Sequence, residues 1–139
     1  MPRLARLYIK TGLLYFVIAL LMALALAAQP VFNLPAGIAA LRPVYLHLLM
    51  VGWVTQLIFG VVYWMFPKYS KEQPRRSEKL AWWVFGLLNA GLILRAVGEP
   101  LATLRPDMNA GWLLAISALL QLAAGWGFVF NTWSRVKER

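Results

Sequence analysis

Long apolar stretches alternate with short polar ones along this chain. Four of the apolar stretches are long enough to cross a bilayer, which takes roughly 20 helical residues at about 1.5 Å each. We expect them as helices over about residues 7–29, 44–66, 80–98 and 110–133. Because the connections between them are short and rich in proline, neighbouring helices should be antiparallel. The pattern therefore predicts an all-α fold, an integral membrane up-down bundle of four transmembrane helices in a single domain, 1–139.

The first apolar stretch has a second interpretation, as a cleaved signal peptide. The basic start MPRLARLYIK precedes it, and ALALAAQ near its end supplies small residues of the kind found at a cleavage site. Its apolar part is long for a signal peptide, so we interpret it as a true transmembrane helix.

Composition supports a membrane protein and excludes several other classes. The chain is 61% hydrophobic and only 14% charged, which is too little charge for the surface of a soluble domain of 139 residues. It contains no cysteine, so disulfides, thiolate catalysis and thiolate metal sites are excluded.

Basic residues orient the predicted bundle. Of the 14 Lys and Arg residues, all but Arg42, Arg95 and Arg105 lie at the termini or in the connection KYSKEQPRRSEK. The positive-inside rule then places both termini and this connection in the cytoplasm. Because topology accounts for the net charge of +9, we expect contact with membrane lipid and not with nucleic acid. The expected location is the cytoplasmic (inner) membrane of a bacterial or archaeal cell, with several passes.

Polar residues inside the predicted helices are few, and each needs a partner or a role in lipid. They include Arg95 and His47, the single histidine of the chain. We place Glu99 in the connection after residue 98, so no Asp or Glu lies within a predicted helix. This absence argues against a proton- or cation-coupled transporter. One histidine and no embedded carboxylate also cannot supply the three ligands of a catalytic zinc site.

His47 and Arg95 are expected at one depth, a few residues inside the outer ends of neighbouring antiparallel helices. Arg42 and Tyr45 stand at the start of the helix that carries His47. A neutral imidazole below arginines suits a haem, whose iron binds the imidazole and whose propionates pair with arginine. In the alternative without a cofactor, His47 hydrogen-bonds to a neighbouring helix, while Arg95 reaches the headgroups or pairs with Glu99.

Small and amide residues point to helix packing. Gly52, Gln56 and Gly60 recur every four residues, and such a row lets another helix approach closely. That helix belongs either to the same chain or to a second copy in a homodimer. Asn89 and Gln121 are expected near mid-membrane, close enough to Gln56 to form a cluster of three amides.

The stretch LRPVYLHLLMVGWVTQLIFGVVYWMFP, residues 41–67, resembles the second-helix region of haem-copper oxidase subunit I. The resemblance is to the cbb3-type oxidases, to bacterial nitric oxide reductases and, more closely, to small stand-alone membrane proteins similar to subunit I. Their pattern is approximately LRPV-H-x-H-LNLLGW, followed by a glycine, a tyrosine and a proline. This chain matches it with LRPV, His47, Gly52, Trp53, Gly60, Tyr63 and Pro67. The resemblance implies a haem b site on the outer side of the bundle, with copper left open as a further metal.

The chain departs from that family pattern at Tyr45, which stands where the family has its first histidine. Residues i and i+2 lie about 200° apart on a helix, so Tyr45 and His47 cannot serve one site interchangeably. Two hypotheses stay open: His47 is the iron ligand, or a tyrosinate from Tyr45 takes that role. Met50, one turn below His47, is a candidate thioether ligand, with packing in the core as the alternative.

Together with the resemblance, these residues predict a haem b-binding membrane protein. His47 would hold the iron, and Arg42 and Arg95 would pair with the propionates. One histidine cannot supply the ligands for two haems and copper, so we do not expect a single chain to reduce oxygen. The expected task is electron transfer with a respiratory-chain redox partner, or binding of nitric oxide or oxygen. The alternative is a haem-free accessory or assembly subunit of a respiratory membrane complex.

Overall fold

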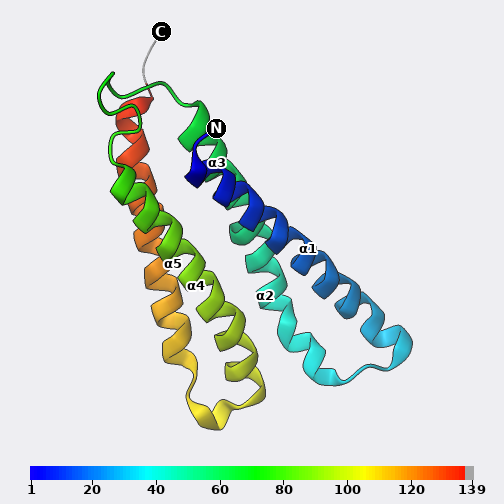
Figure 1. The fold of residues 1–139 in the computed structure, drawn as a ribbon. Helices are drawn as coiled ribbons and strands as arrows, with labels where there is room; N and C mark the ends of the chain where they lie inside the picture. Colours follow the sequence, from blue (N-terminus) through cyan, green and yellow to red (C-terminus); the bar gives the residue numbers. More distant parts are fainter. Residues whose placement is uncertain (137–139) are drawn as a thin grey trace.

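The computed structural model describes residues 1–136, which form long helices joined by short loops (Figure 1). Three of the long helices are continuous: α1 (Arg3–Phe32), α4 (Glu78–Leu104) and α5 (Gly111–Thr132). Short 3-10 helices flank the last of these, namely η3 (Pro106–Met108) and η4 (Trp133–Arg135). The described residues contain no strand, and four helical segments are long and apolar enough to span a membrane. The expected all-α fold with four spans is confirmed.

The second span changes its helical type along its length. It is composed of η1 (Ala36–Leu41), α2 (Arg42–His47), η2 (Leu48–Thr55) and α3 (Gln56–Met65). η1 is a 3-10 helix and η2 is a π-helix, in which backbone hydrogen bonds run over five residues instead of four. The Thr55 hydroxyl donates to the carbonyl of Met50, five residues earlier, at 2.9 Å. π-helical turns are rare and occur frequently at functional sites, and this one begins directly after His47.

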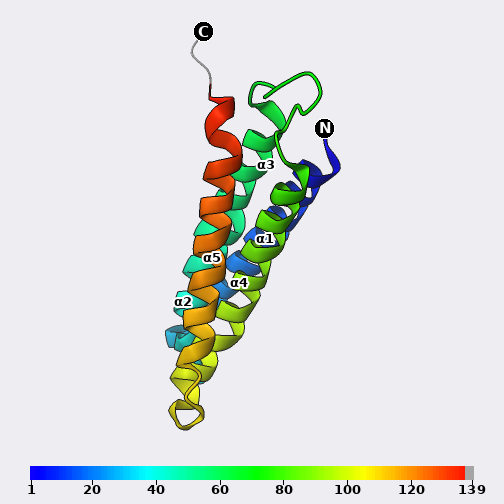
Figure 2. The same ribbon diagram turned by 90° about the vertical axis from the view of Figure 1, so that its left-hand side faces the viewer.

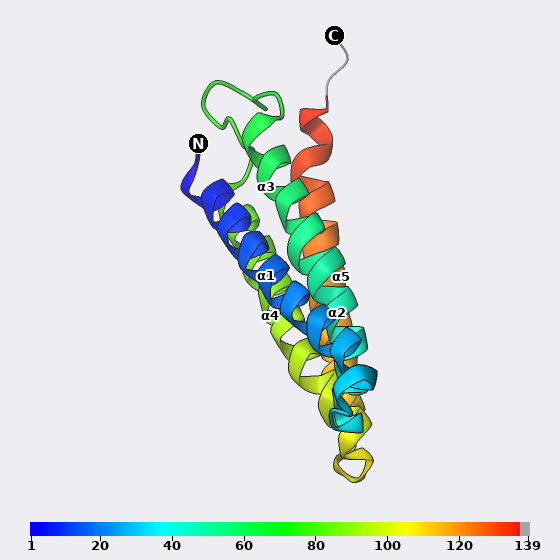
Figure 3. The same cartoon turned by 90° about the vertical axis from the view of Figure 1, so that its right-hand side faces the viewer.

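The four spans are arranged as two antiparallel hairpins. α4 packs against α5 along its whole length (Figure 2), and α1 packs against η2 and α3. The second span also contacts α4, so it joins the two hairpins. At the end that carries the α1–η1 and α4–η3 loops, α1 lies away from α5 (Figure 1), while η1 still contacts α4. Figure 3 shows α1 in front of α4.

Apolar side chains form two clusters, one toward each end of the bundle. The larger lies near the N-terminus, takes residues from all four spans and consists of Leu4, Ala5, Tyr8, Phe59, Tyr63, Ala81, Val84, Leu88 and Ala124. The smaller lies nearer the loop end and consists of Ala19, Val44, Leu48 and Leu92. The smaller cluster takes no residue from α5, and Leu92 of α4 joins it to the second hairpin.

A layer of polar side chains lies between the two apolar clusters. Gln56 is fully buried, accepts a hydrogen bond from the Thr11 hydroxyl at 2.9 Å and donates to Asn89 Oδ1 at 3.0 Å. The Tyr15 hydroxyl donates to the same Asn89 oxygen at 3.0 Å, and Asn89 Nδ2 donates to the Phe85 carbonyl at 2.8 Å. The layer therefore links α1, the second span and α4 through hydrogen bonds that satisfy each amide.

Only two of the three expected amides belong to this layer. Gln121 donates instead to the Ser117 hydroxyl at 3.0 Å, and Ser117 donates to the Gly91 carbonyl at 2.7 Å. Gly91 explains the difference, because a Cβ there would lie 2.8 Å from Gln121 Cγ. The absence of that side chain brings α5 so close to α4 that Gln121 lies over Gly91 and does not reach Gln56.

The row of Gly52, Gln56 and Gly60 faces α1 of the same chain. A Cβ on Gly52 would lie 3.0 Å from the Cβ of Tyr15, and one on Gly60 would lie 2.9 Å from the Cβ of Tyr8. The row was expected to pack against a helix of the same chain or of a second copy. In the structure, α1 of the same chain covers it. A second copy would have to bind elsewhere, and homodimer formation stays a prediction.

Two helices extend beyond the expected limits and contain a proline. α1 continues through Pro30 to Phe32, and α4 continues through Pro100 to Leu104. Glu99 therefore lies inside α4, so the expectation that no acid lies within a span is wrong for this residue. The 27 residues of α4 extend over about 40 Å, more than the ~30 Å of bilayer hydrocarbon. Glu99 stands five residues before the end of that helix and is paired with a cation, as described below.

Candidate functional site

His47 is the last residue of α2, and a hydrogen bond within its own helix orients its ring. Nδ1 lies 3.0 Å from the carbonyl oxygen of Pro43. A carbonyl oxygen only accepts hydrogen bonds, so in this contact Nδ1 carries the proton. Nε2 is then the nitrogen with a free lone pair, which is the arrangement found in histidines that bind metals. The half-buried ring thus has one nitrogen held and one available.

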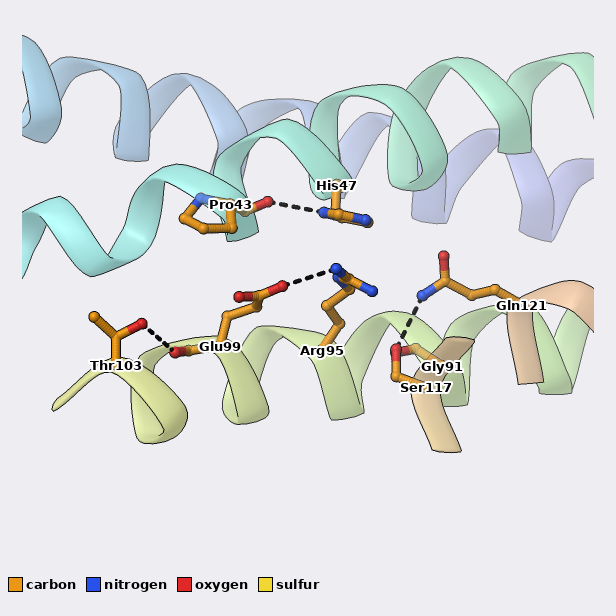
Figure 4. Close-up of polar contacts among 8 residues, drawn as sticks. All are labelled: Pro43, His47, Gly91, Arg95, Glu99, Thr103, Ser117 and Gln121. Carbon is orange, nitrogen blue, oxygen red and sulfur yellow. Dashed lines mark hydrogen bonds and ion pairs between the residues drawn. The ribbon is translucent and has the colours of Figure 1, made fainter. Parts of the chain in front are cut away.

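Arg95 faces His47 from α4 and is paired on its own helix. Figure 4 shows the Arg95 guanidinium and the His47 imidazole pointing toward one another across the space between α4 and α2. Arg95 Nη2 lies 2.9 Å from Glu99 Oε1, and the two side chains are 23% and 13% exposed. This ion pair is the one expected in the alternative without a cofactor. Arg95 Nε is buried and has no hydrogen-bond partner, so the cation is only partly satisfied.

Arg42 and Tyr45 lie on another side of the second span. Both line a groove of about 380 Å³ against α1, where their neighbours include Ala23 and Leu26. The rotation of about 200° between residues i and i+2 accounts for the separation of Tyr45 from His47. The candidate residues thus form two groups, one between α2 and α4 and one between α2 and α1.

Met50 does not pack in either apolar cluster. Its side chain is 56% exposed, on a part of the π-helix that faces away from the interior. The wider π-turns change the angle between successive residues. Met50 therefore does not lie one α-helical turn directly below His47.

Two features of this site were not expected from the sequence. The Pro43 carbonyl, which orients His47, could not have been found from residue types because every residue carries a carbonyl. The position of Glu99 inside α4 was missed because Pro100 follows it and proline commonly ends helices. Its spacing of four residues from Arg95 was the available signal.

The chemistry of the side chains between α2 and α4 suits a haem on three counts. His47 has one free ring nitrogen for iron, fixed by the bond to Pro43. Arg95 offers a buried Nε without a partner to an anionic propionate. Leu48 and Leu92, from the facing helices, belong to the adjoining apolar cluster. A copper centre with several ligands does not fit, because residues 1–136 contain no group of three His, Cys, Asp or Glu side chains.

Comparison with known proteins extends the resemblance to the whole bundle. A family model described as cytochrome C and quinol oxidase polypeptide I matches residues 3–138. This range includes all four spans and not only residues 41–67. No curated protein and no solved structure matches the chain.

Proposed function

Because this chain belongs to the family of cytochrome c and quinol oxidase polypeptide I, we propose that it is a haem b-binding membrane protein. It would act in electron transfer or in the binding of a diatomic gas, nitric oxide or oxygen. The proposed location is the cytoplasmic membrane of a bacterium or archaeon, with a respiratory-chain protein as redox partner.

The orientation of His47 carries this proposal. Its Nδ1 is held by the Pro43 carbonyl at 3.0 Å, which leaves Nε2 as the nitrogen able to bind iron. Hydrogen bonding of this kind fixes both the tautomer and the plane of a ligating imidazole. The backbone of α2 therefore supplies the support that a metal-binding histidine needs.

Arg95 would serve as the cation for a propionate. Its Nε is buried without a partner, while Nη2 is bound to Glu99. An anion that accepts from Nε would complete the hydrogen bonding of the guanidinium. Arg42 would serve only a propionate that reaches the α1 side, because it lines the groove there.

A bound haem would supply a one-electron redox centre and, where iron keeps an open position, a site for a gas. His47 is the single histidine, and Tyr45 and Met50 lie on other sides of the second span, so a six-coordinate iron on His47 needs a residue of a second copy. Five-coordinate iron on His47 alone favours gas binding, and six-coordinate iron favours electron transfer.

Absorption spectroscopy tests the proposal. We expect protein purified after expression with ample haem to show a Soret band and to change on reduction and on addition of carbon monoxide. His47→Ala should abolish or strongly shift that band, while the control Gln121→Ala, whose side chain bonds within α5, should leave it nearly unchanged. A colourless wild-type protein would refute the proposal. An unaltered spectrum in His47→Ala would transfer the ligand role to Tyr45 or Met50.

The Arg95–Glu99 pair favours a second candidate function, a haem-free accessory or assembly subunit of a respiratory complex. This pair already compensates the charge of Arg95 without any cofactor. In that case the oxidase-like helix serves as a scaffold for a partner protein. A colourless wild-type protein that co-purifies with an oxidase subunit would support it.

A further inference from the structure

A groove lined with basic residues opens between α1 and α4 at the end that carries the N-terminus. It has a volume of about 360 Å³ and is lined by Arg3, Arg6, Leu7, Lys10 and Trp82. The first four residues lie at spacings of three, four and seven on α1, so they share one helix face. Trp82 comes from the second turn of α4 and closes the groove from the other side.

The three cations of this groove have no partner within the part of the chain that the structure describes. The ion pairs Arg75–Glu78 and Arg95–Glu99 do not involve these cations, and no hydrogen bond engages their side chains in the described part. Like charges at such spacings on a helix repel one another and destabilise it. The groove is therefore a concentration of positive charge that an anion would relieve.

Two arginines at the same end are engaged by the protein itself. Arg75 pairs with Glu78 at 3.4 Å and lies over the ring of Tyr63 at 5.4 Å. Arg76 donates to the carbonyl of Phe130 and lies 4.2 Å over its ring. The groove thus differs from Arg75 and Arg76 in having charge that no internal group uses, and from the exposed Lys71 and Lys79 in gathering its cations beside apolar side chains.

The groove also has an apolar part suited to a lipid. Leu7 is 36% exposed and Trp82 is 46% exposed, and both lie beside the cations. Tryptophan favours the membrane interface, where its ring lies at the level of the headgroups. Basic pockets between membrane helices on the cytoplasmic side are suited to phosphate-bearing headgroups.

We propose that this groove binds the headgroup phosphate of an anionic phospholipid, with Arg3, Arg6 and Lys10 contacting the phosphate. Leu7 and Trp82 contact the glycerol region and the start of the acyl chains. The site is on the face that the positive-inside rule assigns to the cytoplasm. It is independent of any cofactor near His47.

Native mass spectrometry of the protein in neutral detergent, titrated with phosphatidylglycerol or phosphatidylcholine, tests this site. We expect preferential binding of phosphatidylglycerol. Each basic residue near a membrane surface contributes about 1 kcal/mol, a factor of about five in affinity. Arg6→Gln/Lys10→Gln should therefore weaken phosphatidylglycerol binding roughly thirtyfold. The matched control Lys71→Gln/Lys79→Gln removes two exposed cations at the same end and should stay within about twofold of wild type.

Single variants keep the test valid if the double variant does not fold. Arg6→Gln alone should weaken binding about fivefold, and Arg6→Lys should retain it. Equal binding of the two lipids, or equal losses in the groove and control double variants, would refute the proposal. Displacement of the lipid by inorganic phosphate would also overturn it, because the groove would then recognise phosphate alone.

Discussion

Gln56 donates a hydrogen bond from Nε2 to Asn89 Oδ1 at 3.0 Å, and this contact joins the second span to α4 in the middle of the bundle. Gln56 is 0% exposed, so water cannot replace the contact. The hydroxyls of Thr11 and Tyr15 extend it to α1. Four polar side chains from three spans therefore depend on one another.

Replacement of Asn89 by leucine should destabilise the fold by about 1–2 kcal/mol, because it leaves Gln56 and Tyr15 without their shared acceptor. Thermal unfolding in detergent measures the effect. Gln29→Leu is the control, since that amide makes only an exposed contact of 3.5 Å with the Pro35 carbonyl. A double-mutant cycle with Gln56→Leu should give a coupling energy of about 0.6 kcal/mol or more. Additive effects would contradict the network.

Gly60→Ala should destabilise the protein by about 1–3 kcal/mol through overpacking. A Cβ at this position would lie 2.9 Å from Tyr8 Cβ and 3.3 Å from the Ala5 carbonyl oxygen. Gly86→Ala is the matched control, because nothing lies within 4 Å of the Cβ that it adds. The midpoint of thermal unfolding should fall for the first variant, and it should stay unchanged or rise slightly for the second because alanine favours a helix more than glycine does. Equal midpoints would show that α1 does not approach α3 so closely.

Arg135→Met should loosen the contact between η4 and the end of α3. Although only 1% exposed, the guanidinium donates to the carbonyls of Phe66 at 2.8 Å, Pro67 at 3.1 Å and Tyr63 at 3.3 Å. Hydrogen bonds to a charged group contribute about 1.5–3 kcal/mol, so we expect a loss of at least that size. Proteolysis of the loop over residues 67–77 should become faster, and Arg105→Met, at an exposed position, should leave the rate unchanged. An unchanged rate in Arg135→Met would contradict the expectation that these hydrogen bonds hold η4 against the end of α3.

Arg95 and Glu99 should affect haem content in opposite directions. Arg95→Gln removes the cation proposed for a propionate, and we expect less haem per folded protein. Glu99→Gln removes the internal competitor for that cation, and we expect haem content to be retained or increased. The ratio of Soret absorbance to protein concentration measures both. A loss of haem in Glu99→Gln as large as in Arg95→Gln would indicate that the ion pair only supports the fold.

The class of fold was predictable because apolar length determines what can cross a bilayer. The limits of the helices were less predictable. Pro30 and Pro100 lie near the ends of long helices, where one missing N–H and a local bend are tolerated with the help of neighbouring groups. No pattern of residues marks the π-helix, which packs against α1.

For the candidate site, helical geometry predicted the separation of Tyr45 from His47, and the structure confirms it. The alternative pairing of Arg95 with Glu99 is also observed. What the sequence could not show was how close the helices approach. Because Gly91 has no side chain, α5 packs close to α4, and Gln121 donates its hydrogen bond to Ser117. Distances of this kind depend on the packing of several helices together.

The π-helix η2 (Leu48–Thr55) sets the rotational phase of the second span. In a regular α-helix, the nine steps of about 100° from His47 to Gln56 would turn these side chains to opposite sides. A π-turn rotates less per residue, so His47 lies opposite Arg95 of α4, while Gln56, between α1 and α4, still reaches Asn89. Removal of one residue from η2 would restore α-helical winding and turn the imidazole away while the Gln56 contact stayed in place. The number of residues in η2 therefore determines whether the His47 ring faces the candidate site.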